Sequence, residues 1–344
     1  MSDETTRPYA GLTPEVVLDA LESTGLRGDG RLLALNSFEN RVYLANLEGA
    51  APDEGFAARS VVAKFYRPAR WSDAQIGEEH AFARSLAELE IPVVAPQMLS
   101  GCTLHEFAGF RFAVYPRCGG RPPELEDPNV LEWIGRFIGR IHSLGAAAPF
   151  RERPALDLEG FGKLPRDWLL ANANLPAELK EVWRSVADQA LDGVRVAWER
   201  AGRVATIRLH GDCHVGNILW TEPDARRGAS GGPHFVDLDD ARSGPAVQDL
   251  WMLLPGERAV AEKSLAALLR GYERFFEFDR GELCLVEALR TLRLLHYAYW
   301  IARRWDDPAF PAAFPWFGTQ RYWEDRIQEL REQISAMQDP PLAC

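Results

Sequence analysis

One stretch of the chain reads Leu209-His210-Gly211-Asp212-Cys213-His214-Val215-Gly216-Asn217-Ile218-Leu219-Trp220. Apolar residues lead into it and out of it, and an Asp and an Asn stand five positions apart between them. A second stretch reads Phe235-Val236-Asp237-Leu238-Asp239-Asp240, an apolar run that ends in carboxylates. Carboxylate and amide oxygens are the ligands that magnesium prefers, so the two stretches together predict a magnesium site.

The order His-x-Asp, then four residues, then Asn is typical of the catalytic loop of kinases. In that loop the Asp accepts the proton of the attacking hydroxyl and the Asn holds a magnesium ion. Phosphoryl transfer depends mainly on in-line positioning and on neutralising the charge of the phosphate oxygens. We therefore interpret Asp212 as the catalytic base, Asn217 as a magnesium ligand, and Asp237 as a catalytic residue that also binds magnesium.

Two other interpretations use the same residues. A single Asp or Asn near a glycine is usually a turn residue, but that does not explain the joint pattern. A metal-dependent hydrolase is the sharper alternative. It would use His210, Asp212 and His214 as transition-metal ligands, with His234 or His296 as a further ligand.

The region before these stretches is predicted to be rich in strands, at residues 31–35, 41–47, 60–66, 103–107 and 110–115. Lys64 lies near the end of the third strand. In the kinase arrangement such a lysine contacts the α- and β-phosphates and pairs with a helical Glu. The next helix, capped by Ser72 and running to about residue 90, offers Glu79 as that partner, with Glu78 left open.

The turn between the first two strands contains Ser37, and it lacks the glycines of the protein-kinase nucleotide loop. We expect the Ser37 hydroxyl and nearby backbone amides to contact the nucleotide phosphates. A plain polar turn fits the local sequence equally well.

A Pro- and Gly-rich run is predicted to form a hinge at 117–123, between an N-terminal nucleotide-binding lobe at 1–116 and a C-terminal catalytic and substrate lobe at 124–344. Beyond it, helices are expected at about 127–144 and 176–200, and two more between 257 and 304. Residues 151–174 are expected to be loop-rich. A further helix is expected to start at Pro245. In it, Asp249 either bonds the catalytic-loop backbone or lies on the surface. The predicted fold is α+β, two-lobed and protein kinase-like.

Composition narrows the function classes. The 344 residues are 47% hydrophobic and 26% charged, with a formal net charge of −11, which argues against nonspecific nucleic-acid binding. No apolar run is long enough to span a membrane, and residues 1–9 contain no apolar signal core. The five cysteines form no CxxC pair, which indicates a reducing compartment. We expect a cytoplasmic monomer.

In these motifs the chain resembles the aminoglycoside phosphotransferase-like kinases, whose fold is similar to that of protein kinases. The motifs are His210-Gly211-Asp212-x-His214-x-x-Asn217, the apolar strand to Asp237, and Gly244-Pro245-x-x-x-Asp249-Leu250. Residues 35–43, 62–68, 208–214, 237–242 and 307–311 look, more closely, like the bacterial stress response kinases. The resemblance covers nearly the whole chain, although the loop at 221–233 is longer than is usual there.

The resemblance implies a cytoplasmic serine/threonine protein kinase that uses ATP and magnesium, autophosphorylates and acts in stress survival. It assigns proton acceptance to Asp212, magnesium binding to Asn217 and Asp237, and nucleotide contacts to Ser37 and Lys64. It gives His210 and His214 structural roles, in which they orient the loop through hydrogen bonds. The acceptor stays open, because related enzymes phosphorylate aminoglycosides, homoserine or choline. A catalytically silent regulatory protein is disfavoured, since the base, the lysine and the metal ligands are all present.

Overall fold

The computed structural model describes residues 8–49, 60–173, 175–223 and 231–343. These residues form two compact units. The first contains the described part of 1–124 together with 151–153 and 214–241, and the second contains 125–150, 154–213 and the residues from 242 onward. The chain passes from the second unit to the first directly after Cys213, within the predicted catalytic loop. The lobe boundaries and the hinge predicted from sequence stay predictions.

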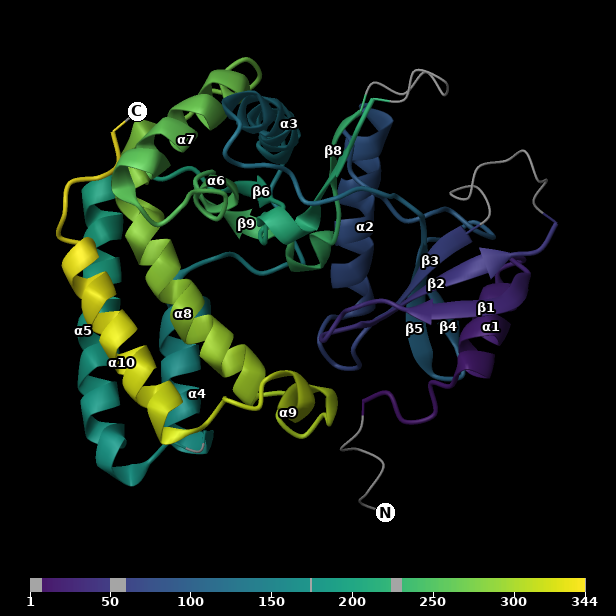
Figure 1. The fold of residues 1–344 in the computed structure, drawn as a ribbon, viewed down its shortest axis with the longest axis horizontal. Coiled ribbons are helices and arrows are strands. Elements are labelled where there is room, and N and C mark those ends of the chain that lie inside the picture. The colour runs from purple at the N-terminus through teal and green to yellow at the C-terminus, as the bar shows by residue number, and fades with distance from the viewer. Residues whose placement is uncertain (1–7, 50–59, 174, 224–230, 344) are drawn as a thin grey trace. The chain divides into compact units, whose positions relative to one another are not determined.

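The first unit is built on a five-stranded antiparallel sheet in the order β1-β2-β3-β5-β4 (Figure 1). The strands are β1 (Gly28–Ala34), β2 (Arg41–Leu47), β3 (Ser60–Phe65), β4 (His105–Phe107) and β5 (Phe110–Pro116). Helix α1 (Pro14–Ser23) packs Val17 and Leu21 against Val61, Phe65 and Phe112 of the sheet. Burying these apolar side chains stabilises the unit at about 25 cal/mol for each Å² removed from water.

Two further elements of this unit carry candidate residues. Helix α2 (Asp73–Glu88) begins with the predicted capping box, since Ser72 and Gln75 satisfy each other's backbone amides. Strands β7 (Ile218–Thr221) and β8 (Gly232–Phe235) form a hairpin, flanked by single 3-10 turns at Val215–Asn217 and Leu238–Asp240. Residues 224–230 of the long loop predicted at 221–233 lie outside the described residues.

The second unit is mostly helical. Helices α5 (Ala177–Ala201), α8 (Val286–Ala302) and α10 (Gln320–Ala336) lie side by side, as Figure 1 shows. Its other elements are α3 (Pro128–Gly145), α4 (Leu164–Asn172), α6 (Gln248–Trp251), α7 (Arg258–Tyr272), α9 (Ala309–Ala313), a 3-10 helix at Arg280–Leu285, and the strand pair β6 (Ile207–Leu209) and β9 (Arg242–Gly244).

Glycines allow α3 and α7 to pack backbone against backbone. A Cβ atom at Gly135 would lie 2.0 Å from the carbonyl oxygen of Leu268, and one at Gly271 would lie 1.9 Å from that of Glu132. Neither distance leaves room for a side chain. This close contact fixes α3, whose His142 belongs to the network described below.

Two expectations were wrong. Residues 151–174 are not simply loop, because they contain a π-helical turn at Glu159–Lys163 and helix α4. Pro165 lies in the first turn of α4, where a proline is tolerated because its missing N–H would have no helical partner. The helix expected to start at Pro245 begins at Gln248, since Pro245 only accepts a turn hydrogen bond from the Gln248 amide.

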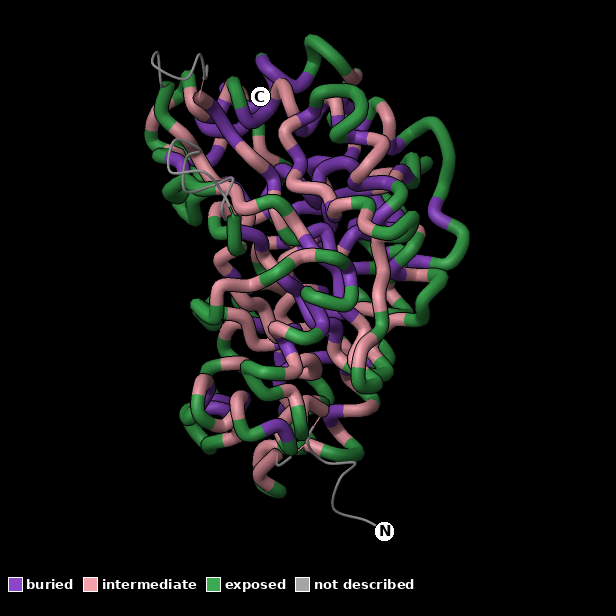
Figure 2. The backbone as a smooth tube through the Cα atoms, turned by 90° about the vertical axis from the view of Figure 1, so that its right-hand side faces the viewer, coloured by how far each residue is buried: buried purple, intermediate pink, exposed green. Residues whose placement is uncertain are grey.

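The separation of one antiparallel sheet from a mostly helical unit is the α+β architecture that the sequence predicts. Buried residues recur along most elements, and exposed residues gather on the surface turns (Figure 2). In the described part of the chain, no helix combines the length and the apolar character that crossing a bilayer requires.

Candidate active site

Asn217 and Asp237 flank the same end of the β7–β8 hairpin. Ile218 pairs with Phe235, and the amide of Val236 donates to the carbonyl of Asn217 at 3.0 Å. Asp237 has a left-handed backbone, with φ 59° and ψ 61°, and its side chain is 54% exposed. A non-glycine residue in this conformation costs about 1 kcal/mol, which is typical of sites where the backbone aims a side chain.

Lys64 reaches this end of the hairpin from β3. Its Nζ lies 2.7 Å from Oδ1 of Asp237 and 3.3 Å from Oδ1 of Asp239. Burial acts to lower the pKa of Lys64, but the carboxylates of Asp237 and Asp239 outweigh it and hold that pKa well above its usual value. The buried lysine is therefore charged, and it stands beside the predicted metal ligand.

Asp239 is the centre of an ion-pair cluster that the sequence analysis missed. Its side chain is buried, and it accepts hydrogen bonds from Asn40 Nδ2 at 3.1 Å and from Arg70. Arg70 also pairs with Asp240 at 2.9 Å. Burial acts to raise the pKa of Asp239, but Arg70 and then Lys64 hold it below its ordinary range. The signal available in the sequence was the acidic run 237–240, which needs cations if it is buried.

The two glutamates proposed as partners of Lys64 lie in different surroundings. Glu78 accepts hydrogen bonds from the backbone amides of residues 151, 152 and 153 at 2.6, 2.9 and 2.9 Å, so its carboxylate anchors that segment. Glu79 is buried, and burial raises its pKa to about 7 although Lys64 opposes the shift. Among the described residues, no ion pair joins Glu79 to Lys64.

Ser37 lies in the loop between β1 and β2, and it is half-buried. Its hydroxyl makes no hydrogen bond to another residue of the described ranges. Lys64, Asp237 and Asn217 are thus brought together in the first unit, whereas no hydrogen bond among the described residues joins Ser37 to them.

Asp212 belongs to the second unit, where it follows β6. Its Oδ1 lies 2.6 Å from Nη1 of Arg293 on α8, and the Arg293 side chain is 42% exposed. The sequence analysis missed Arg293. The available signal was weak: an arginine in a largely apolar helical run, 81 residues from its partner.

Asp249 anchors the backbone of the same loop. Its buried carboxylate accepts hydrogen bonds from the amides of His210 at 2.7 Å and Gly211 at 2.8 Å. It also lies 3.0 Å from Nε2 of His142, whose Nδ1 is 2.8 Å from the hydroxyl of Tyr272. Of the two alternatives for Asp249, bonding to the catalytic-loop backbone is therefore the one that the structure shows.

Three histidines of the hydrolase alternative make other contacts within the chain. His214 Nδ1 accepts from the Gly216 amide at 3.0 Å, and His234 lies 3.2 Å from the Thr221 hydroxyl. The ring of His296 stacks on Phe161 with centroids 4.1 Å apart. Within the described ranges, no group of three or more His, Cys, Asp or Glu residues could hold a metal ion. The described residues therefore offer the hydrolase interpretation no support.

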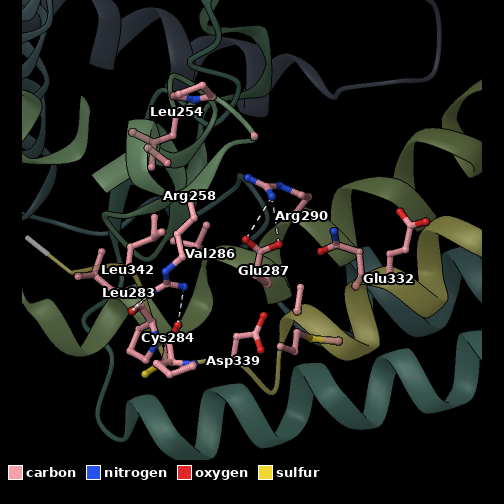
Figure 3. Close-up of a pocket in the computed structure, with 18 of the residues that line it drawn as sticks. Leu254, Arg258, Leu283, Cys284, Val286, Glu287, Arg290, Glu332, Asp339 and Leu342 are labelled. Atoms are coloured by element: carbon pink, nitrogen blue, oxygen red, sulfur yellow. Dashed lines mark hydrogen bonds and ion pairs between the residues drawn. The ribbon is translucent and has the colours of Figure 1, made fainter. Parts of the chain in front are cut away.

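A pocket of about 260 Å³ lies elsewhere in the second unit (Figure 3). Arg258 crosses it to the carbonyls of Pro340 and Pro341, at 2.9 and 2.7 Å, and Arg290 pairs with Glu287 at 3.1 Å. None of its lining residues is a predicted site residue. The guanidinium groups of Arg258 and Arg290 both have partners within the chain, so the pocket offers no evident recognition of a ligand.

A buried, charged lysine on a strand, an Asn and an Asp at one hairpin end, and an anchored His-Gly-Asp loop are the features that the sequence led us to expect of a kinase-like phosphotransferase. The chain belongs to the phosphotransferase enzyme family (APH), which matches residues 31–286. Its predicted two-lobed, kinase-like α+β fold is thereby confirmed, and the curated relatives described next confirm its resemblance to stress response kinases.

Curated relatives cover almost the whole chain. It is 43% identical to Stress response kinase A of Escherichia coli (strain K12) over 334 residues, which is 97% of this chain and 96% of the relative. The same identity and coverage hold for the Serine/threonine protein kinase RdoA of Salmonella typhimurium (strain LT2). The family and these relatives identify the chain as a kinase.

Solved structures are similar in fold at low sequence identity. An amicoumacin kinase in complex with AMP-PNP and Ca²⁺ superposes with a TM-score of 0.70 at 18% identity, covering 100% of this chain and 98% of the other. A microcompartment-associated aminopropanol kinase superposes with a TM-score of 0.65 at 16% identity, covering 94% of this chain and 96% of the other.

Proposed function

We propose that the chain is an ATP- and magnesium-dependent serine/threonine protein kinase, which phosphorylates protein hydroxyls, including its own, in a bacterial stress response. The observation that carries the proposal is the charged Lys64 beside Asp237, at the hairpin end that also holds Asn217. The names of the 43%-identical relatives support the serine/threonine specificity and the stress role. The AMP-PNP complex of the amicoumacin kinase supports the use of ATP.

The donor set fits magnesium, because Asn217 and Asp237 offer an amide and a carboxylate oxygen at one end of the hairpin. These two residues would hold the ion. When bound, it would neutralise charge on the phosphate oxygens. The Asp237 side chain is 54% exposed, so an ion could reach it and replace the Lys64 ammonium group as its partner.

Lys64 keeps a counter-ion in this scheme. If Asp237 held a metal ion, Asp239 would still pair with the lysine from 3.3 Å, and Glu79 would be a second carboxylate that acts on it. The ammonium group then binds the α- and β-phosphates. Ser37 donates to the phosphates.

Asp212 orients the acceptor hydroxyl and takes its proton as the hydroxyl oxygen attacks the γ-phosphorus. Asp249 fixes the loop that carries this carboxylate, and Arg293 holds its Oδ1. In the sequence, Asp212 stands five residues before Asn217, so the base and the metal ligand are joined by a short segment.

A small-molecule hydroxyl kinase is the alternative, because the amicoumacin and aminopropanol kinases share the fold and fold alone does not fix the acceptor. The test incubates purified protein with γ-labelled ATP, with and without magnesium, alone and with a mixed protein substrate. We expect magnesium-dependent label on serine or threonine, found by phosphoamino-acid analysis. Label that reaches only hydroxylated metabolites would favour the alternative, and absence of any transfer would contradict both.

A further inference from the structure

Helix α6 holds the loop that carries Asp212 through two neighbouring side chains. Asp249 accepts from the amides of His210 and Gly211. Gln248, the residue before it, donates from Nε2 to the carbonyl oxygen of Gly211 at 3.0 Å. Both side chains are buried. Gly211 is therefore held at its amide by one α6 residue and at its carbonyl by the preceding one, directly before Asp212.

The Gly211 carbonyl belongs to the peptide bond that joins Gly211 to Asp212. Gly211 has a φ of 87°, in the left-handed region that glycine adopts freely. Because glycine restricts its own backbone so little, the residue type alone does not determine how the plane of this peptide bond is rotated. A hydrogen bond to the carbonyl does determine it. The Asp212 side chain leaves the backbone directly after this plane, so the direction of its carboxylate depends on that bond.

The amide group of Gln248 is itself held in one orientation. Its Oε1 accepts from Trp251 Nε1 at 3.1 Å, so each end of the amide meets a group of the matching kind. Trp251 is buried, and Glu282 accepts from the Val247 amide at 2.8 Å, directly before α6. The short helix is thus anchored on either side of Gln248. The amide cannot follow a rotated Gly211 carbonyl without losing its bond to Trp251.

We propose that Gln248 is a positioning residue for phosphoryl transfer, because it fixes the Gly211–Asp212 peptide and thereby aims the Asp212 carboxylate at the acceptor hydroxyl. This rests on the proposed function, in which Asp212 takes the proton of that hydroxyl. Arg293 holds the carboxylate at 2.6 Å, and Gln248 holds the backbone from which it extends. The catalytic base is thus fixed from both sides. The role of Gln248 is the same for a protein acceptor and for a small-molecule acceptor.

The first test replaces Gln248 by Met, which is similar in length but cannot donate to the Gly211 carbonyl. A misplacement of about 1 Å costs an enzyme about 100-fold in rate, so we expect kcat to fall about 10- to 100-fold. The KM for ATP should stay within about twofold, because Gln248 holds the base and not the nucleotide. Rates are expressed per nucleotide-binding site, counted by titration with ADP, so that unfolded protein does not contribute. Gln189→Met, at an exposed position on α5, is the control and should leave kcat and KM unchanged.

The second test replaces Gln248 by Glu, which keeps the shape of the side chain and the acceptor for Trp251. When protonated, the carboxyl can donate to the Gly211 carbonyl as the amide does, whereas the ionised carboxylate has no donor and repels that carbonyl. Burial and the neighbouring Asp249 carboxylate raise the pKa of a carboxyl at this position, and Arg290, 5.5 Å from the Trp251 ring, acts to lower it. A general loss of stability would not follow the protonation of this one group.

We therefore expect Gln248→Glu at about pH 6 to have a kcat at least about tenfold above that of Gln248→Met, each taken relative to the wild type at the same pH. This advantage persists only while the carboxyl is protonated. Equal ratios for the two variants at every pH would overturn the proposal. So would a kcat of Gln248→Met within about twofold of the wild type, or a raised KM at unchanged kcat.

Both tests measure transfer of label from γ-labelled ATP, with magnesium, to a mixed protein substrate and to a panel of hydroxylated metabolites. A wild-type protein that transfers to neither would remove the proposed function itself, and the role of Gln248 with it. An active wild type with an equally active Gln248→Met variant would overturn the role of Gln248 alone.

Discussion

Lys64 and Asp237, 173 residues apart in the sequence, form an ion pair of 2.7 Å. The pair joins the last residues of a sheet strand to the end of the β7–β8 hairpin. In the proposed function Lys64 binds phosphates and Asp237 binds metal, so nucleotide and metal would bind by replacing this contact. Asp239 contacts the lysine independently of Asp237, so it would keep Lys64 in position during such an exchange.

Replacing Lys64 by Met should weaken ATP binding about 10- to 100-fold, since the variant loses a charge-assisted bond to phosphate worth about 1.5–3 kcal/mol. Isothermal titration of the nucleotide measures this. Lys263→Met, at an exposed position on α7, is the control and should bind ATP as the wild type does. Equal affinities of the two variants would remove Lys64 from the site.

Asp249→Ala should lower the free energy of unfolding by about 3 kcal/mol, because it leaves the amides of His210 and Gly211 and the ring of His142 without their buried acceptor. Urea denaturation measures the loss. Asp192→Ala, on α5 with a side chain 76% exposed, should stay within about 0.5 kcal/mol of the wild type. If Asp249→Ala also stayed within about 0.5 kcal/mol of the wild type, other contacts would have to hold the loop.

Gly135→Ala and Gly77→Ala should change stability in opposite directions. At Gly135 a Cβ would lie 2.0 Å from the Leu268 carbonyl, so α3 and α7 must separate, at a cost of about 1–3 kcal/mol. At Gly77, inside α2, a Cβ meets nothing within 4 Å. There alanine should stabilise by about 0.5–1 kcal/mol, through lower chain entropy in the unfolded state. Thermal melts of both variants test the packing of α3 on α7.

Glu282 should give the protein a stability that falls as pH rises. Burial raises the pKa of Glu282 to about 7, although the carboxyl accepts from the Val247 amide at 2.8 Å. Below about pH 4.5 both states carry the proton. Between about pH 4.5 and 7 only the unfolded state releases the proton. The free energy of unfolding therefore falls by about 1.4 kcal/mol per pH unit, or about 3 kcal/mol in all.

The test compares the wild type with Glu282→Gln by chemical denaturation at pH 5 and pH 8. Glutamine can still accept from Val247 but does not titrate. The variant should therefore gain stability relative to the wild type as pH rises. Parallel pH profiles of the two proteins would show that Glu282 is not the group responsible.

The elements predicted correctly from the sequence have strong local signals. The capping box of Ser72 and Gln75 gives the start of α2, and the alternating strands give most of the sheet. Helix α4 was missed because Pro165 is a helix breaker in most positions but is accommodated in a first turn. A proline at such a position fits both a helix break and the first turn of a helix, and the sequence alone does not distinguish the two.

The residues that surround the candidate site were harder to predict. Arg70 and Asp239 are 169 residues apart, and Arg293 and Asp212 are 81 apart, so each pair exists only through the fold. Nothing in their own sequence neighbourhoods distinguishes these arginines from surface charges. Asp249 could not be assigned from the sequence for the same reason, because the loop amides that it accepts from lie 39 and 38 residues away.

The measurement that tests the account most directly compares nucleotide affinity and phosphoryl transfer in Asp212→Asn. We expect ATP affinity close to that of the wild type and a transfer rate about 100- to 10 000-fold lower, the usual contribution of a general base. Asp306→Asn, at an exposed position, is the control and should leave both unchanged. A folded Asp212→Asn variant that transfers phosphate at the wild-type rate would contradict the assignment of Asp212 as the base.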